Sequence, residues 1–585
     1  MRTVDSSPIR VPVGPGAERW TCRTPQHRIL LVVHNVTSAN RLMDILPLFH
    51  DDFRIQLLAT STESSAFQGG IGELFTALGL PVLPWKQALS TPVDLAISAS
   101  FGGQLPSING KLSILSHGVG YTKKLAGSRE PTFGLSPEWL LPNGEQFVDG
   151  LVLSHPEQLD RLRRVCPATV DAAVLAGDPC FDRMLAARRY RARFRRALGV
   201  RRGQRLVVIN STWNPEGLFG DQQHDVLPSL LPRLATELPA DDYRVAAVLH
   251  PNIWFGHGPG QIRAWLDRAV RSGLALIDPV HHWRQAILAA DAVVGDFGAV
   301  SYYASALDIP VLIAAPGDGR LDPQAPLATF VEQAPRLDPY APLEAQLTQL
   351  ITGHRPQPDS AEFITSAPGR SAPLLRRHFY SLLNLPEPPA PALLEPLPLP
   401  PFDPPTRTVP LHVYTRISGT DIVITRSTAQ PYSPYDADGS THLAVHEQTR
   451  DPSALELADV ITRDGPADDA RLGGAAAWAA EALHLYPHCS AAAYVSEHDV
   501  CRVHTRKHGQ FLLASQPDAD VDPAAGASAL HAWLASGHSV PPDGLTLRLH
   551  TSGAVHAVDV TGGLARPHSA AADLPDSASV GSRQE

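Results

Sequence analysis

The chain of 585 residues is too long for one hydrophobic core and indicates two or three domains. Hydrophobic residues make up 43% of it, which is enough to form buried cores. Length and composition therefore exclude a single-domain protein. The formal net charge of −10 is mild for this length and by itself argues neither for nor against an anionic partner; no nucleic-acid partner is expected.

The cysteines and the N-terminus indicate the compartment. The five cysteines are Cys22, Cys166, Cys180, Cys489 and Cys501. They form no CxxC pair and no regular framework, which fits a reducing compartment. The first 20 residues lack the apolar core of a signal peptide, and the apolar run at 29–33 is too short to span a bilayer. We expect a cytoplasmic protein, with peripheral docking at the inner face of the membrane left open.

The first predicted domain spans residues 26–198 and follows a polar N-terminus, residues 1–25, that is expected to be disordered. The strands predicted in it are 28–34, 55–59, 95–99, 112–115 and 150–154. Helical patterns lie between them, and such alternation predicts a doubly wound α/β domain of Rossmann type.

An Arg-rich helix at 182–198 leads into a second predicted domain, residues 199–386. One interpretation of this helix is a solvated link between domains, and the other is contact with an anionic acceptor or membrane face. The strands predicted in the second domain are 205–209, 244–249, 292–294 and 309–314. Two Rossmann-like domains in tandem are typical of the B-type glycosyltransferase (GT-B) architecture.

Proline is so dense in residues 387–408 that a semi-rigid spacer is predicted there. The helical pattern at 374–385, just before it, is a candidate to pack back across the two domains. Residues 409–564 predict a small α+β module. Its three predicted hairpins turn at 418–421, 497–499 and 551–553. Residues 565–585 form a polar tail that is expected to be disordered.

The stretch 281–315 has the pattern of a nucleotide-binding α/β domain: helix, strand, polar turn, helix, strand. Asp296 ends a strand, and Gly298 and Ser301 open the next helix. In parallel sheets ligands lie outside the carboxyl ends of strands, where a helix N-terminus offers amides to an anion. These three residues are therefore candidates to hold a phosphate or ribose. The alternative is that Asp and Gly only shape a turn that caps the helix.

Two histidines follow strand ends and are candidates for chemistry. His117 lies in a loop bracketed by glycine, near Lys123 and Lys124. A histidine there could act as the base for an alcohol, and the lysines could hold an acceptor's phosphate. His250 could donate to a diphosphate, and Thr212 offers a hydroxyl in the same domain. For each of them the alternative is an ordinary loop or cap residue.

No metal is expected, because the His and Cys residues of the C-terminal module show no zinc-binding spacing. Walker, GxSxG, GxGxxG and HExxH motifs do not occur in the sequence. No cofactor is expected either, since fixed dipoles can stabilise a departing nucleotide.

Five short motifs, in order along the chain, resemble the CDP-glycerol glycerophosphotransferases, the family of the teichoic-acid polymerases. They are SHG at 116–118 with the lysine pair 123–124, GDPCFD at 177–182, ARFRRALGVRRGQRLVVINSTW at 192–213, HP at 250–251 and DFGAVS at 296–301. The resemblance covers about residues 110–315.

The resemblance implies that His117 is the base toward the acceptor hydroxyl and that His250 contacts the donor diphosphate. It places the lysine pair on the acceptor side. The residues that it places along or close to a cytidine diphosphate are Thr212, Asp296, Gly298 and Ser301.

The chain also departs from the family. Ser116 replaces the Trp before the first His, no Arg precedes His250, and Gly298-Ala299 replace tandem serines. These changes concern the donor more than the fold.

The sequence thus predicts transfer of a glycerol-phosphate-like, polyol-phosphate or glycosyl group from a nucleotide diphosphate donor, CDP-glycerol-like, to an acceptor hydroxyl. A role in cell-envelope polymer synthesis, with a membrane-associated acceptor as one option, follows from the resemblance. The alternatives are a nucleotide-sugar glycosyltransferase, a UDP-N-acetylglucosamine 2-epimerase-like enzyme, and a binding module without catalysis.

Overall fold

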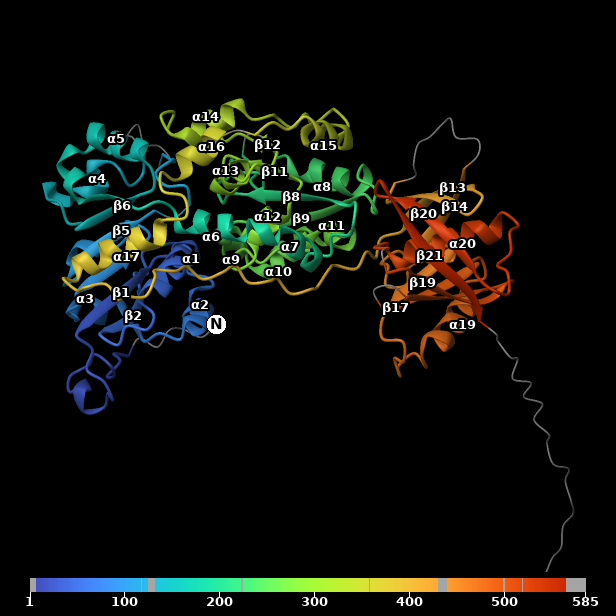
Figure 1. Ribbon diagram of the computed structural model, residues 1–585, viewed down its shortest axis with the longest axis horizontal. Coiled ribbons are helices and arrows are strands. Elements are labelled where there is room, and N and C mark those ends of the chain that lie inside the picture. The colour runs from blue at the N-terminus through green and yellow to red at the C-terminus, as the bar shows by residue number, and fades with distance from the viewer. Residues whose placement is uncertain are drawn as a thin grey trace, which may run out of the picture. The chain divides into compact units, whose positions relative to one another are not determined.

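The computed structural model describes residues 7–116, 118–124, 132–222, 225–356, 358–429, 439–497, 500–517 and 519–563. The chain divides into two compact units (Figure 1). The first unit is residues 1–409 with 427–430, and the second is residues 410–426 with 431–585. Each unit is described by itself.

The first unit contains a seven-stranded parallel sheet in the order β3-β2-β1-β4-β5-β6-β7. Its strands are β1 His27–Val33, β2 Ile55–Ser61, β3 Val82–Leu83, β4 Leu95–Ser98, β5 Lys111–Leu115, β6 Gly150–Leu153 and β7 Ala173–Leu175. The helices between them are α1 Val36–Ile45, α2 Ile71–Leu78, α3 Trp85–Ser90, α4 Pro137–Leu140 and α5 Pro156–Val165. The central strands are buried on both faces, which explains why they are continuous apolar runs.

A second parallel sheet follows in the same unit, with five strands in the order β10-β9-β8-β11-β12. Its strands are β8 Arg205–Ser211, β9 Tyr243–Leu249, β10 Ala275–Leu276, β11 Ala292–Asp296 and β12 Val311–Ala315. Its helices are α8 Leu227–Thr236, α9 Pro251–His257, α10 Pro259–Trp265, α11 Asp267–Arg271, α12 Trp283–Ala289, α13 Ala299–Ala306, α14 Pro326–Gln333 and α15 Leu343–Thr352. The prediction of two parallel α/β sheets is confirmed.

In both sheets the strand order reverses beside the first strand, between β1 and β4 and between β8 and β11. Helices that follow the two strands of such a pair lie on opposite faces of the sheet, so the loops at their carboxyl ends diverge and leave a crevice. Ligands of open α/β sheets bind in that crevice. The topology therefore indicates one candidate binding edge in each sheet.

The Arg-rich segment between the two sheets is two helices, α6 Pro179–Ala187 and α7 Arg191–Ala197. Met184 and Phe194 are buried in a core cluster that includes residues of the second sheet. Arg191 and Arg195 each pair with Asp291 at 2.6 Å. These contacts favour the linking interpretation of this segment, with Arg191 and Arg195 bound to Asp291 of the second half.

After α16 Pro358–Ile364, helix α17 Ser371–Leu382 returns the chain to the first sheet. His378 Nε2 lies 3.0 Å from Ser113 Oγ on β5, and the rings of Phe379 and Phe49 are 5.6 Å apart. The helical pattern predicted at 374–385 therefore packs against the first α/β half.

Two segments of the first unit differ from the expectations. Disorder was expected for residues 1–25, but within the described part Ile9 exchanges two backbone hydrogen bonds with the Gln87 amide, at 2.7 and 2.8 Å. The Pro-rich segment 387–408 is bound along the first unit instead of standing free. Its carbonyl oxygens accept hydrogen bonds from Arg183 and Gln285. Proline has no backbone N–H, so a Pro-rich segment does not form a regular hydrogen-bond ladder. Its carbonyl oxygens can instead accept hydrogen bonds from side chains of the unit.

The second unit is a closed barrel in the order β13-β14-β20-β21-β19-β18-β17-β16-β15. Its strands are β13 Leu411–Ser418, β14 Asp421–Ser427, β15 Ser440–His446, β16 Val460–Asp464, β17 Ala491–Glu497, β18 Val500–Thr505, β19 Gly509–Ser515, β20 Leu545–Thr551 and β21 Ala554–Gly563. Its helices are α18 Pro452–Glu456, α19 Ala475–Leu485 and α20 Pro523–Ala535. The three predicted hairpins are present, as β13–β14, β17–β18 and β20–β21.

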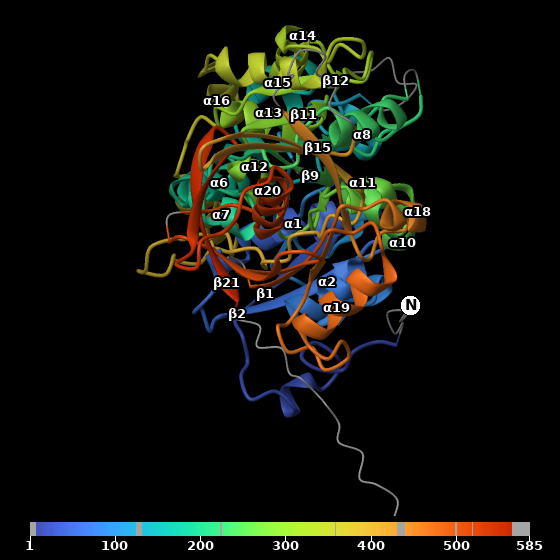
Figure 2. The ribbon, with the colours of Figure 1, turned by 90° about the vertical axis from the view of Figure 1, so that its right-hand side faces the viewer.

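The sequence predicted a small α+β module, and in the described residues its strands form a closed barrel with helices. Helix α20 lies among the barrel strands (Figure 2), and nearly all of its residues are buried. Ala525, Ala527 and Ala529 belong to the same core cluster as apolar residues of the strands. Small side chains allow a helix to fit inside a narrow barrel. A local sequence pattern cannot distinguish such a helix from an ordinary Ala-rich surface helix.

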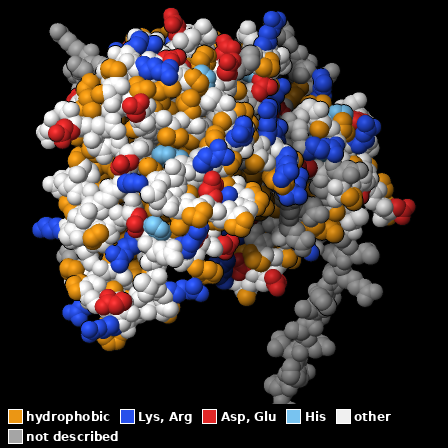
Figure 3. Space-filling view, turned by 60° about the vertical axis from the view of Figure 1, so that its left-hand side comes forward, with side chains coloured by type: hydrophobic (Ala, Val, Ile, Leu, Met, Phe, Trp, Pro, Cys, Tyr) orange, Lys and Arg blue, Asp and Glu red, His pale blue; other side chains and the backbone are white. Residues whose placement is uncertain are grey.

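No helix within the described ranges has the length and apolar character needed to cross a membrane. On the face shown in Figure 3, acidic and basic side chains are interspersed with apolar ones. The predicted tail 565–585 lies outside the described residues.

A buried charge cluster joins the two α/β halves of the first unit. Arg41 on α1 donates to Asp178 Oδ1 at 2.5 Å and to Tyr303 Oη at 3.2 Å, and Tyr303 donates to Asp178 Oδ2 at 2.5 Å. Asp178 also caps α6, since its Oδ1 accepts from the backbone N–H groups of Cys180 and Phe181. One carboxylate therefore holds α1, α6 and α13 together.

We expect Asp178→Asn to destabilise the first unit strongly. The amide oxygen can still cap α6, but the variant leaves the buried Arg41 cation without its countercharge, which costs about 3–5 kcal/mol. Pulse proteolysis in urea, with fragments assigned by mass spectrometry, measures the first unit separately.

The matched control is Asp160→Asn, because Asp160 pairs with Arg163 at 2.8 Å where both side chains are more than half exposed. It should change the unfolding free energy by about 0–1 kcal/mol. Equal effects of the two substitutions would contradict the role given to Asp178.

Candidate functional site

A pocket of about 230 Å³ lies between the two α/β halves of the first unit, at the carboxyl ends of strands of both sheets. From the first half it is lined by the start of α1, the residues after β4 and the residues after β5. From the second half it is lined by the ends of β8 and β9 and by the start of α13. It thus occupies the crevices that the strand orders indicate.

Asp296 lies behind the part of the pocket wall that the second α/β half forms, and its hydrogen bonds hold that part in place. Its Oδ2 accepts hydrogen bonds from the backbone N–H groups of Thr212 at 2.8 Å and Leu218 at 3.0 Å, and its Oδ1 accepts from that of Gly298 at 2.9 Å. The side chain is fully buried, and burial raises the pKa of Asp296 above its ordinary value. Asp296 therefore ties the loop after β8 to the start of α13.

The N-terminus of α13 faces the pocket through Gly298, Ala299 and Val300. No side chain caps this helix, and the N–H groups of its first turn have no helical carbonyl to bind. A Cβ at Gly298 would lie 2.9 Å from Asp296 Oδ1 and 3.1 Å from Thr212 Cβ, so the close packing requires glycine. This helix start is suited to an anion.

Ser301, one turn further into α13, is fully buried, and its Oγ lies 3.3 Å from Asn210 Nδ2. Neither Ser301 nor Asp296 is among the residues that line the pocket. These two residues support the wall from behind, and their contact with a donor stays a prediction. Thr212 and Gly298, by contrast, belong to the wall itself.

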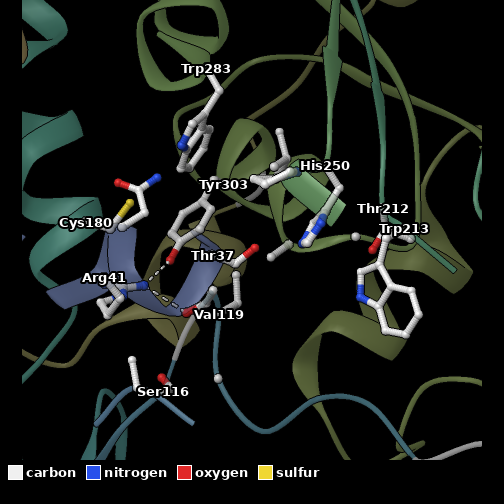
Figure 4. A pocket seen from close by; sticks show the side chains of 18 of the residues that line it. Thr37, Arg41, Ser116, Val119, Cys180, Thr212, Trp213, His250, Trp283 and Tyr303 are labelled. Carbon is white, nitrogen blue, oxygen red and sulfur yellow. Dashed lines mark hydrogen bonds between the residues drawn. The ribbon is translucent and has the colours of Figure 1, made fainter. Parts of the chain in front are cut away.

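His250 directly follows β9 and caps α9. Its Nδ1 accepts a hydrogen bond from the backbone N–H of Asn252 at 3.1 Å, and its own backbone N–H donates to Ser211 O at 3.0 Å. In the neutral ring the proton is then on Nε2, because Nδ1 is used as an acceptor. The imidazole reaches into the pocket from the second half (Figure 4), where it can donate to a ligand oxygen.

Lys123 comes from the first half but reaches the second. Its Nζ donates to Thr212 Oγ1 at 2.9 Å and lies 3.3 Å from Asn214 Oδ1. Burial lowers the pKa of Lys123 to about 8, against the charge of Asp296, which raises it. Its backbone forms an antiparallel bridge with Leu321 of the second half. The ammonium group therefore lies against the loop after β8 in the second half.

The other predicted residues of the first half differ in position. Lys124 donates its backbone N–H to Arg320 O at 2.9 Å and does not line the pocket. His117 lies outside the described residues. Its neighbour Gly118 has φ +76°, and a Cβ there would lie 3.3 Å from Ala299 Cβ, so glycine lets the two halves approach closely.

Several residues of the pocket were not predicted from the sequence. Trp213 packs its ring edge-on against Phe67 of the first half, with centroids 5.1 Å apart. Arg41 and Tyr303, two members of the buried charge cluster, also line the pocket (Figure 4). Arg41 and Asp178 are 137 residues apart, so no local pattern indicates their pairing. Trp213 could have been singled out as the aromatic residue directly after the Thr212 loop.

Among the described residues, no three His, Cys, Asp or Glu side chains are arranged to hold a metal ion. The polar groups of the pocket are instead backbone amides, an imidazole, a hydroxyl and an ammonium group. This set can neutralise a diphosphate through hydrogen bonds and fixed charge.

No protein-family model and no curated protein sequence matches the chain. Similar solved structures include a variant of the wall teichoic acid polymerase TagF, 13% identical over 62% of this chain and 89% of that one, with a TM-score of 0.43. The UDP-GlcNAc 2-epimerase of Methanocaldococcus jannaschii is 11% identical over 60% and 99%, with a TM-score of 0.40. Anabaena HepE is 13% identical over 61% and 100%, with a TM-score of 0.31. At these values the likenesses assign neither a family nor a function.

The lowered pKa of Lys123 can be measured directly. We expect its acetylation by acetic anhydride, followed by mass spectrometry, to rise with a midpoint near pH 8, because burial disfavours the charged amine. Arg320→Met should raise this midpoint and Glu216→Gln should lower it, since Arg320 lowers the pKa and Glu216 raises it. A midpoint near the ordinary lysine value of about 10.4, unmoved by either variant, would show that Lys123 is not buried as described.

Proposed function

We propose that this pocket binds a nucleotide diphosphate donor and that the protein transfers a glycerol-phosphate-like, polyol-phosphate or glycosyl group from it to an acceptor hydroxyl. One observation carries the proposal: the first turn of α13, the His250 imidazole and the Lys123 ammonium group converge on the second-half side of one pocket. A diphosphate is the ligand that uses all three.

Each group has a distinct role in this proposal. The N–H groups of Ala299 and Val300 receive the phosphate oxygens at the helix start. His250 donates from Nε2 and stabilises the charge that develops on the departing nucleotide. Lys123 supplies a positive charge beside Thr212, and this contact supports assigning it to the donor, although the sequence had suggested the acceptor.

The transfer needs no covalent intermediate. The acceptor hydroxyl attacks the transferred group, its proton passes to a base, and the bond to the nucleotide breaks. For a glycerol-phosphate donor the broken bond is the P–O bond of the diphosphate, and the nucleoside monophosphate leaves. For a glycosyl donor the sugar C–O bond breaks and the nucleoside diphosphate leaves. His117 remains the proposed base, on the resemblance alone.

The choice of donor and setting also rests on the resemblance. It favours a cytidine nucleotide, CDP-glycerol-like, over other donors, and it favours cell-envelope polymer synthesis in the cytoplasm, peripheral to the inner face of the membrane. No dissociable cofactor is part of the proposal.

The epimerase alternative is disfavoured by the charges of the pocket. An epimerase would need carboxylates facing the ligand. Among the described lining residues the carboxylate is that of Asp44, and Arg284 Nη2 lies 2.9 Å and 3.0 Å from its two oxygens. This carboxylate is therefore paired with a cation of the protein itself.

The proposal is tested by titrating the full chain with CDP, UDP and GDP in a calorimeter and by assaying turnover of CDP-glycerol and UDP-sugars. Lys123→Met should weaken nucleotide binding about 10- to 100-fold, since a charged hydrogen bond contributes about 1.5–3 kcal/mol. His250→Asn keeps a side-chain cap for α9 and removes the imidazole, and it should lower turnover about 10²- to 10³-fold.

Lys86→Met and His257→Asn are the matched controls, because both residues are exposed and neither lines the pocket. They should leave binding and turnover unchanged. Nucleotide binding without turnover of any donor would favour the binding module, and the absence of nucleotide binding would contradict the proposal.

A further inference from the structure

The first-half side of the pocket carries a group of apolar side chains beside its polar ones. The side chains that form it include Phe101, Leu115, Val119, Tyr121 and Phe133. The Tyr121 hydroxyl donates to Val152 O at 3.3 Å, so the phenol is satisfied within the protein. The ring of Phe133 is fixed from behind by Trp139, with centroids 4.6 Å apart. This wall is an ordered apolar surface.

The charged groups near this wall already have partners. Arg41 pairs with Asp178 and donates to Gly118 O, and Asp44 pairs with Arg284. Lys123 is directed to Thr212 on the donor side. Among the described lining residues, therefore, no cation is left to bind a phosphate carried by the acceptor.

One polar atom of the wall lacks a partner. Thr37, at the second position of α1, lines the pocket, and its Oγ1 is buried without a hydrogen-bond partner among the described residues. A buried hydroxyl without a partner costs stability, which a ligand that bonds it would restore. Thr37 and His250 reach into the pocket from the two different halves (Figure 4), so a ligand hydroxyl bound at Thr37 would face the donor groups.

We propose that the acceptor is a neutral alcohol joined to an apolar group, with its hydroxyl bound by Thr37 Oγ1 and its apolar group against Phe101, Val119 and Phe133. This inference rests on the proposed function and names the substrate class of its acceptor side. It replaces the phosphate-bearing acceptor that the lysine pair suggested. Thr37 orients the hydroxyl, and the proton still leaves to a separate base.

Two probes with the same glycerol hydroxyls separate the possibilities: 3-phenoxy-1,2-propanediol carries an aromatic ring, and sn-glycerol 3-phosphate carries a phosphate. Both are titrated into the full chain in the presence of saturating CDP. The phenoxy compound should bind at least about 10-fold more tightly, because its ring is removed from water. Tighter binding of glycerol 3-phosphate would overturn the inference.

Thr37→Val keeps the shape of the side chain and removes its hydroxyl. It should weaken binding of the phenoxy compound about 3- to 10-fold, the effect of one neutral hydrogen bond, and leave CDP binding unchanged. Thr76→Val is the matched control, since Thr76 is an exposed helical threonine of α2 whose Oγ1 bonds Gly72 O. It should change neither affinity.

Val119→Thr makes the apolar wall polar at nearly constant volume and tests the wall independently of Thr37. It should weaken the phenoxy compound and not glycerol 3-phosphate. Unchanged phenoxy binding in both Thr37→Val and Val119→Thr would overturn this inference while nucleotide binding stands. If the wild-type chain does not bind CDP, the proposed function on which the inference rests is contradicted instead.

Discussion

The candidate site depends on one buried carboxylate. Asp296 receives backbone N–H groups from the loop after β8 and from the start of α13, so it fixes both sides of the β8–β11 crevice at once. A neutral or shorter side chain could not accept from Thr212, Leu218 and Gly298 together, and each amide would lose its partner in the interior. The position of the helix start, of Thr212 and therefore of Lys123 all follow from this arrangement. Asp296 shapes the site without lining it.

The second constraint is the closure of the two α/β halves over the pocket. Arg41, Asp178 and Tyr303 join them at one end, and Lys123 joins them at the other through Thr212. Around the start of α13 the pocket offers backbone amides, the His250 imidazole and the Lys123 ammonium group, and the rings of Phe101 and Phe133 line it from the first half.

Much of the local structure could be predicted from the sequence. Buried parallel strands are continuous apolar runs, so β1, β8, β9 and the strand before Asp296 were located from hydrophobicity alone. Strand ends bear the polar loops, which is why Thr212, His250 and Gly298 were placed in the site. The remaining features depend on long-range contacts. The pairing of Arg41 with Asp178, the parallel pair β14–β20 that helps close the barrel, and the binding of the Pro-rich segment by Arg183 have no local pattern. Ser301 and Asp296 were assigned to the ligand because sequence does not distinguish a wall from the layer behind it.

The central claim is that a nucleotide diphosphate binds where α13 begins, beside His250 and Lys123. Hydrogen-exchange mass spectrometry of the full chain with and without CDP tests it most directly, because bound phosphate protects the amides that it contacts. The account predicts slower exchange in peptides that cover 298–303 and 250–253, with little change in 410–563. Unchanged exchange at the start of α13 under saturating CDP, UDP and GDP, or protection confined to the second unit, would contradict it.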